Sequence, residues 1–175
     1  MALTHCVASP ARQRTAAGDA AHTRGVPVAA DAYTTQPGSP ASDSTLLVGR
    51  RVFEENCRAC HGTAGLGAPG LVPPLIASAL VTGPPATLLR IVLDGLTGPI
   101  DVAGVRYAGD AEMPGWRDRL SDREIAALAS YLRAWRPNDA PPVAAATVAA
   151  VRNATAERAR PWTAAELTVA EREAP

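Results

Sequence analysis

The feature that most constrains this chain is the segment from Cys57 to His61, which reads C-R-A-C-H and so matches the pattern C-x-x-C-H. This pattern is the attachment signature of a c-type haem. The spacing suits the chemistry, because two thiols add to the two vinyl groups of one porphyrin while the adjacent histidine presents a ring nitrogen to the iron. We therefore predict one covalent haem c at Cys57, Cys60 and His61.

A zinc site and a thioredoxin-like redox pair are two other interpretations of these cysteines. Tetrahedral zinc takes four ligands, and the remaining candidates, Cys6, His5 and His22, all lie in an N-terminal segment without a regular hydrophobic period. A thioredoxin-like pair requires a β-α-β pattern around it, and no strand pattern adjoins Cys57. The haem interpretation is favoured, and a non-haem metal-binding module is kept as an alternative.

A low-spin electron-transfer haem needs a sixth iron ligand. Apart from Met1, the one methionine is Met113, in a stretch rich in glycine and proline. A methionine usually fills a gap in a core, but core methionines lie on helices or strands rather than in loops. We therefore predict Met113 as the sixth ligand, with His5 or His22 as the alternative. If Met113 does not ligate, the iron keeps an open position and the chain is a peroxidase-like haem enzyme.

Composition excludes two functional classes. Seventeen basic side chains balance seventeen acidic ones, whereas a nucleic-acid-binding domain has an excess of basic residues. No apolar run approaches the about 18 residues of a membrane-spanning helix, so no transmembrane segment is predicted. Much of the 47% hydrophobic content is alanine and only 4% of residues are aromatic. A haem would supply the bulky apolar filling that such a core lacks.

The chain divides into three parts by composition and periodicity. Residues 1–43 show no sustained period, and residues 31–44 have linker-type composition, so we predict a disordered, leader or linker segment. Residues 44–137 carry the helical patterns and form the predicted domain. Residues 138–175 are an alanine-rich tail, for which we predict short helices.

Helical patterns are clearest at three places in the middle part. The first helix begins near Thr45, and the second runs from Pro85 to Leu93 with a proline in its first turn. The third follows a capping box of Ser121 and Glu124 and stops at Pro137.

The ordered combination of these features resembles a class I monohaem cytochrome c over roughly residues 45–137. The features are the C-x-x-C-H motif, Pro73-Pro74-Leu75, Met113-Pro114 and the helix after Ser121. The resemblance implies an all-α fold of about four helices around one covalent haem. Residues 113–135 and 148–167 are similar to the cytochrome subunits of bacterial membrane-bound dehydrogenases and oxidases. This implies an electron carrier, not an enzyme, between a dehydrogenase or quinol-side donor and a terminal acceptor, with dehydrogenases, oxidases or other cytochromes as partners.

The resemblance also implies two thioether anchors, two axial ligands and four pocket residues. These are, in that order, Cys57 and Cys60, His61 and Met113, and Pro73, Leu75, Tyr107 and Trp116. The carbonyl of Pro73 is expected to accept a hydrogen bond from the second ring nitrogen of His61, although Pro74 suits the same role. Leu75 is expected to pack on the haem face, with Tyr107 and Trp116 on the distal side.

The same resemblance places Gly49 and Phe53 of the first helix against Tyr131 and Trp135 of the last. Ordinary core packing accounts for all of these aromatic rings equally well, because large rings in an aromatic-poor chain are expected to be buried. No role is predicted for Trp162.

In the family, haem is attached outside the cytoplasmic membrane, which implies a periplasmic protein with an export signal. Arg12 and Arg14 resemble the basic start of such a signal, but residues 15–24 contain no large apolar side chain, unlike a signal peptide. We expect a periplasmic protein, with association with a membrane complex as a further possibility.

Overall fold

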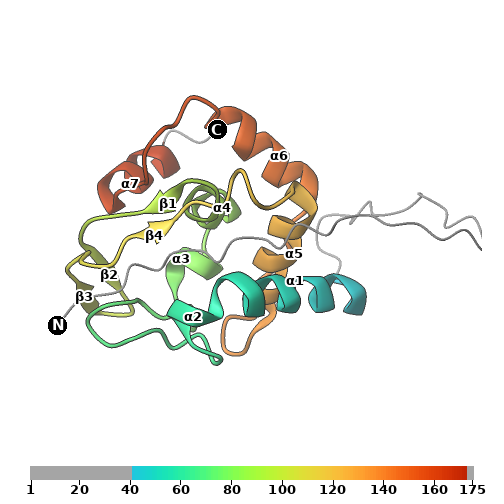
Figure 1. The fold of residues 1–175 in the computed structure, drawn as a ribbon, viewed down its shortest axis with the longest axis horizontal. Helices are drawn as coiled ribbons and strands as arrows, with labels where there is room; N and C mark the ends of the chain where they lie inside the picture. The colour runs from blue at the N-terminus through green and yellow to red at the C-terminus, as the bar shows by residue number, and fades with distance from the viewer. Residues whose placement is uncertain (1–40, 173–175) are drawn as a thin grey trace, which may run out of the picture. The chain divides into compact units, whose positions relative to one another are not determined.

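Helices dominate residues 41–172, which are the residues described by the computed structural model (Figure 1). The helices are α1 (Asp43–Asn56), α2 (Arg58–His61), α3 (Ala79–Thr82), α4 (Pro85–Asp94), α5 (Asp122–Ala134), α6 (Ala145–Ala154) and α7 (Ala164–Arg172). The strands are β1 (Gly95–Leu96), β2 (Ile100–Val102), β3 (Val105–Tyr107) and β4 (Met113–Pro114). The predicted all-α class is confirmed. The described residues contain more helices than the four expected, because two are single turns and two lie in the tail. The segment predicted for residues 1–43 lies almost wholly outside the described residues.

The first and last helices of the predicted domain cross at a glycine. A Cβ atom on Gly49 of α1 would lie 2.6 Å from the Cβ of Tyr131 on α5 and would overlap the backbone of Ala127. Next to the crossing, the ring centroid of Trp135 lies 5.0 Å from that of Phe53 and 5.2 Å from that of Tyr131, edge to face in both pairs. The expected contact between these two helices is therefore present, and glycine permits the close approach.

Helices α4 and α5 supply most of the large buried side chains. The α5 helix starts with the expected capping box, in which the Ser121 hydroxyl accepts from the Glu124 backbone N–H and the Glu124 carboxylate accepts from that of Ser121. Proline opens α4 and Gly95, with φ of 89°, closes it. Their buried faces, which include Leu89, Leu93 and Leu128, form one side of the core.

Residues 95–114, which have no regular pattern in the sequence, contain two small antiparallel sheets. Strand β1 pairs with β4, so that Leu96 lies opposite Met113, and β2 pairs with β3. Ala103 and Gly104 both have positive φ, 50° and 76°, as a tight hairpin turn requires. Strands of two or three residues are too short for periodicity to reveal.

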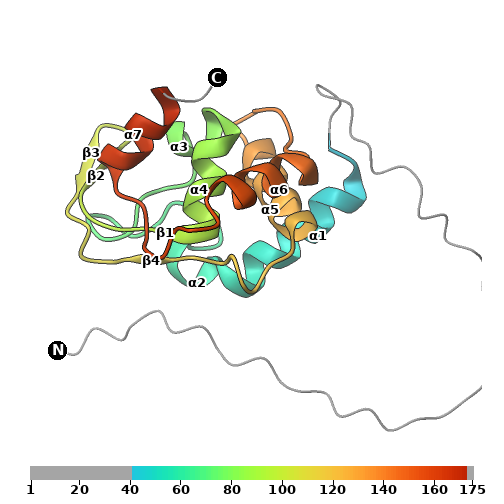
Figure 2. The same ribbon diagram turned by 90° about the horizontal axis from the view of Figure 1, so that it is seen from above.

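The C-terminal tail packs on the helical domain. Helix α6 lies against α4 and α5, and α7 lies against α4 (Figures 1 and 2). Val148 of α6 and Leu167 of α7 are 0% and 3% exposed. The tail thus contributes side chains to the core.

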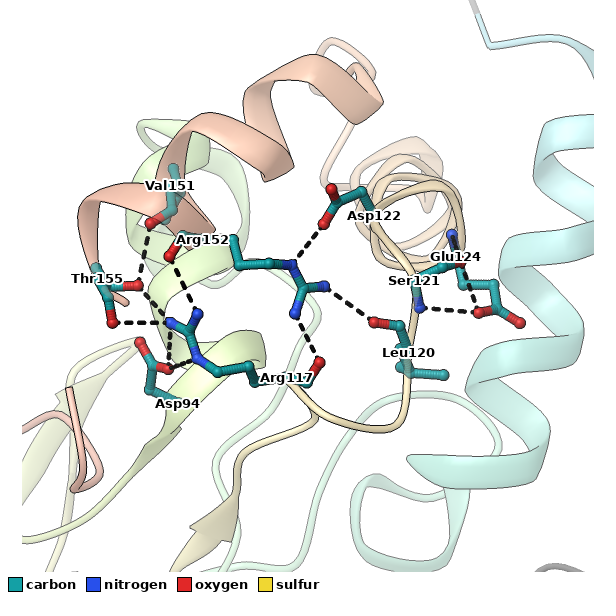
Figure 3. A network of polar contacts seen from close by, with 9 residues as sticks. All are labelled: Asp94, Arg117, Leu120, Ser121, Asp122, Glu124, Val151, Arg152 and Thr155. Carbon is teal, nitrogen blue, oxygen red and sulfur yellow. Dashed lines mark hydrogen bonds and ion pairs between the residues drawn. The ribbon is translucent and has the colours of Figure 1, made fainter. Parts of the chain in front are cut away.

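Two arginines hold the tail to the domain (Figure 3). Arg152 of α6 forms an ion pair of 2.7 Å with Asp122 and donates to the carbonyls of Arg117 and Leu120. Arg117 donates in return to the carbonyls of Arg152 and Thr155, at 3.1 Å each. Each arginine therefore pairs with backbone carbonyls of the segment that carries the other.

Candidate haem site

The C-x-x-C-H motif forms one helical turn at the end of α1. Cys57 closes α1, with its backbone N–H donating to the carbonyl of Phe53 at 2.9 Å, and it also opens α2. His61 is the last residue of α2, and its N–H donates to the carbonyl of Cys57 at 3.0 Å. Gly62 follows with φ of 72°, a left-handed conformation that suits glycine. The local sequence thus brings both cysteines and the histidine onto one compact turn.

An apolar cavity opens beside this turn. Six of the eight predicted site residues line it: Cys57, His61, Pro73, Leu75, Met113 and Trp116. Apolar side chains of α3, α4 and α5, among them Val81, Val92 and Leu128, complete the walls. The motif turn, the proline-rich loop, the strand of Met113 and three further helices therefore meet at one cavity.

The ring of His61 has a fixed orientation. It is 8% exposed, and its Nδ1 lies 3.3 Å from the carbonyl oxygen of Pro73. Because a carbonyl only accepts, Nδ1 carries the proton and donates it, which leaves Nε2 available as a ligand. Burial lowers the pKa of His61, against a smaller opposing effect of the Pro73 hydrogen bond. The ring is therefore held in the neutral form that binds metals.

The loop between His61 and Leu75 is organised by its own backbone. Gly67 donates to the carbonyl of His61 at 3.0 Å, and Leu75 donates to the carbonyl of Gly65 at 2.7 Å. Gly65, with φ of 65°, packs against the ring of Trp135, where any Cβ atom would overlap the ring. These contacts fix the position of the Pro73 carbonyl that His61 requires.

Met113 reaches the cavity from the two-residue strand β4, not from a loop as the sequence led us to expect, and lies on a different part of the chain from His61. Its backbone is held by the pairing of Leu96 with Met113 and by the close approach of Gly95 to the Met113 carbonyl. Three residues further on, Trp116 is 7% exposed and also lines the cavity.

The two cysteines differ in their surroundings. Cys57 lines the cavity, and burial raises the pKa of its thiol to about 12, as an apolar environment does. Cys60 is partly buried and is not among the cavity-lining residues.

Tyr107 does not line the cavity, contrary to the expectation for the distal side. It lies on β3 and is 6% exposed within a second hydrophobic cluster that also contains Ile91, Leu96, Trp162 and Leu167. Met113 packs against this cluster. Tyr107 therefore belongs to the cluster against which Met113 packs, to which the β2–β3 hairpin contributes the tyrosine and α7 contributes Leu167.

Several cavity residues were not singled out from the sequence. These include Ser78, Val81, Leu88 and Val92. Leu88 and Val92 belong to the apolar stripe of α4, which does not distinguish a wall of a cavity from an ordinary core face. Ser78 and Val81, at the start of α3 and within it, have no sequence signal.

The donor set fits a haem. His61, with its tautomer fixed, and Met113, from a separate segment, line one apolar cavity together with Cys57. Imidazole and thioether are axial haem ligands, and an apolar shell limits water at the iron. Residues 41–172 contain no group of three or more His, Cys, Asp or Glu side chains able to hold a metal ion.

Comparison with known proteins agrees with this site. A family model described as "Cytochrome C oxidase, cbb3-type, subunit III" matches residues 44–132. Chloroplastic cytochrome c6 of Chlamydomonas reinhardtii is 33% identical over 114 residues, 63% of this chain and 68% of that protein. A nicotinate dehydrogenase subunit of Pseudomonas putida is 41% identical over 92 residues, which are 51% of this chain and 7% of that subunit. The cytochrome c subunit of the quinone-type alcohol dehydrogenase of Gluconobacter oxydans is 34% identical over 95 residues, 53% and 19% of the two chains.

The match to the family model spans half of the chain, and the chain therefore belongs to this family of cytochromes c. Its domain is that of a monohaem class I cytochrome c, a family that carries covalently attached haem c. The chain spans less than a fifth of the two dehydrogenase subunits that it matches.

Proposed function

We propose that this cytochrome carries single electrons on a haem that is attached through Cys57 and Cys60 and ligated by His61 and Met113. The observation that carries this proposal is that His61 and Met113 line the same apolar cavity, with the His61 ring oriented by Pro73. When bound, the haem iron supplies a reversible one-electron couple between its ferrous and ferric forms.

The protein's residues do three things for such a couple. The Pro73 carbonyl orients His61 and makes its Nε2 more basic. The sulfur of Met113 would hold the iron as a second protein ligand, which would raise the potential and leave no open site for a small molecule. The apolar walls formed by residues such as Leu88 and Leu128 exclude water, which keeps the ligand environment the same in both oxidation states.

Two measurements test this assignment. Mass spectrometry of the denatured protein should show the mass of one haem, because thioether bonds survive unfolding. The ferric protein should show a low-spin spectrum with the weak far-red charge-transfer band of a sulfur ligand. A high-spin ferric spectrum without this band would instead support a peroxidase-like haem enzyme, and a polypeptide without added mass would support a non-haem module.

For its partners, we propose a dehydrogenase or quinol-side donor and an oxidase or second cytochrome as acceptor. The names of two relatives, a nicotinate dehydrogenase subunit and a cytochrome c subunit of an alcohol dehydrogenase, support this class of partner. With a formal net charge of zero, the protein has little long-range field to steer an encounter. Leu66 and Leu71, 66% and 37% exposed, lie in the loop that carries Pro73 and offer apolar contact area.

We place the protein in the periplasm, where the family's haem attachment occurs. Within residues 41–172, no helix has the length and apolar character to cross a membrane. Cell fractionation combined with isolation of membrane complexes tests both the location and the partners. A haem-loaded protein that co-purifies with a periplasm-facing oxidoreductase is the expected result, and a haem-loaded protein found only in the cytoplasm would contradict the location.

A further inference from the structure

We infer that Trp162, in the segment between α6 and α7, is a positioning residue for Met113: by pairing with β1, it fixes the strand that presents the methionine sulfur to the cavity. The inference rests on the proposed role of Met113 as sixth ligand. It concerns a part of the chain, the C-terminal tail, to which the electron-carrier function alone assigns no task.

The first observation is that β1 has a neighbour on each of its two edges. On one edge Leu96 lies opposite Met113. On the other edge the Trp162 N–H donates to the carbonyl of Gly95 at 3.0 Å, and Thr97 donates to the carbonyl of Trp162 at 2.8 Å. Two-stranded pairing alone is marginally stable, whereas a third strand stabilises it. Strand β1 therefore lies between Trp162 on one edge and the strand of Met113 on the other.

The second observation is that the Trp162 side chain is anchored on two sides. The residue is 8% exposed, and its Nε1–H donates to Oδ2 of Asp94, the residue before β1, at 3.2 Å. On its face lies the guanidinium of Arg158, 3.6 Å from the ring centroid, and Arg158 is itself ion-paired with Glu166. A buried tryptophan with its N–H satisfied is a rigid support, because few rotamers are open to it.

The third observation links the same anchor to the far side of Met113. The other oxygen of Asp94 pairs with Arg117, four residues after Met113, at 2.7 Å. Arg117 in turn donates to Arg152 and Thr155 of the tail (Figure 3). The segment from Met113 to Arg117 is thus held by β1 at its start and by Asp94 and the tail at its end. Trp162 is hydrogen-bonded both to the backbone of β1 and to the carboxylate of Asp94.

A fixed strand matters because an axial sulfur competes with other ligands for the iron. If the backbone at Met113 is free to move, the sulfur-bound state is less populated, and an external ligand binds more tightly in proportion. Met113 also packs against the cluster that contains Trp162, so removal of the indole frees space for such movement. The expected signature is a change in ligand competition, not only a loss of stability.

The test is a cyanide titration of the ferric, haem-loaded full chain, followed by absorption. In Trp162→Ala we expect about tenfold tighter cyanide binding than in the wild type, equivalent to about 1.4 kcal/mol. Both variants keep the backbone groups that pair with β1, so the titration tests the side chain that anchors them; Trp162→Phe also keeps most of the buried ring and loses the hydrogen bond to Asp94. It should tighten cyanide binding about threefold, since one hydrogen bond is lost, and it serves as the test if the alanine variant does not load haem.

Val148→Ala is the matched control. Val148 is fully buried in α6, which packs on α4 and α5, so this variant lowers the stability of the same tail at a different place. Its cyanide affinity should equal that of the wild type. An unchanged affinity in both Trp162 variants, or an equal change in Val148→Ala, would overturn the inference.

Met113→Ala separates this inference from the ligand assignment. It should bind cyanide much more tightly than the wild type, because no sulfur competes. If the wild type and Met113→Ala bind cyanide equally, Met113 is not the ligand and the proposed function fails at that point. If Met113→Ala changes and the Trp162 variants do not, only the positioning role is wrong.

Discussion

Asp94 and Arg117 form an ion pair of 2.7 Å in which the carboxylate is 4% exposed and the guanidinium 19%. Asp94 is the last residue of α4, directly before β1, and Arg117 follows β4. The pair therefore joins the two segments that carry the paired strands β1 and β4, and β4 contains Met113. Since Asp94 also accepts from Trp162, one carboxylate joins three parts of the chain.

Asp94→Asn should destabilise the protein by about 2 kcal/mol. Removing one charge of a buried pair leaves the other uncompensated, which costs about 3–5 kcal/mol when burial is complete. We expect a smaller loss here, because the Arg117 guanidinium stays partly exposed to solvent and still donates three hydrogen bonds to the tail. The matched control is Asp101→Asn, which removes the pair with Arg106 whose side chains are 64% and 63% exposed. That variant should change the free energy of unfolding by less than about 1 kcal/mol. Chemical denaturation measures both, and equal effects would contradict the prediction.

Gly49→Ala should destabilise the crossing of α1 and α5. The added methyl group would overlap backbone of α5 at Ala127 and lie 2.6 Å from Tyr131 Cβ, and overpacking of this kind costs about 1–3 kcal/mol. Alanine has the higher helix propensity, so a stability gain would show that the helices separate without cost. Glu55→Ala, at an exposed position of the same helix, is the control and should be close to neutral. Thermal unfolding of the haem-loaded variants gives the comparison.

Glu166 should contribute to acid sensitivity. The backbone N–H of Thr163 is the largest cause that lowers the pKa of Glu166, from an ordinary 4.5 to about 2, with Arg158 adding to it. Because the folded-state pKa is depressed, this carboxylate stabilises the fold above pH 4.5, and that contribution is lost as the pH falls from there toward 2. Glu166→Gln should therefore lower stability at neutral pH and approach the wild type near pH 2. A difference in melting temperature that stays constant across this range would contradict the assignment.

Met113→Leu should keep the haem attached while lowering its reduction potential by on the order of 0.1 V, because the axial ligand is a main determinant of a range of about 0.8 V. Leucine preserves the volume of the side chain, so packing changes little. Spectroelectrochemical titration measures the shift. A potential within experimental error of the wild type would remove Met113 from the ligand set.

Local sequence patterns predicted the parts of the structure that depend on neighbouring residues. The capping box of Ser121 and Glu124 starts α5 as expected, and the proline at position 85 opens α4. The C-x-x-C-H motif lies on one turn beside the cavity because its residues are adjacent in the chain. The ligand roles of His61 and Met113 remain predictions that the cavity supports.

Contacts between distant segments were beyond the reach of these patterns. Asp94 and Trp162 are separated by 68 residues, and nothing in either local sequence marks them as partners. Trp162 therefore had no predicted role, and Tyr107 was expected in the cavity although it lies in the cluster with Leu167. Strands β1 and β4 have two residues each, so only their pairing with each other and with Trp162 defines them.

Iron K-edge X-ray absorption of the ferric protein tests the ligand set most directly, because it reports which elements lie in the first coordination sphere. We predict one sulfur neighbour in addition to nitrogen, with the sulfur lost in Met113→Leu. A coordination sphere of nitrogen and oxygen alone in the wild type would contradict ligation by Met113, the central claim of the ligand assignment.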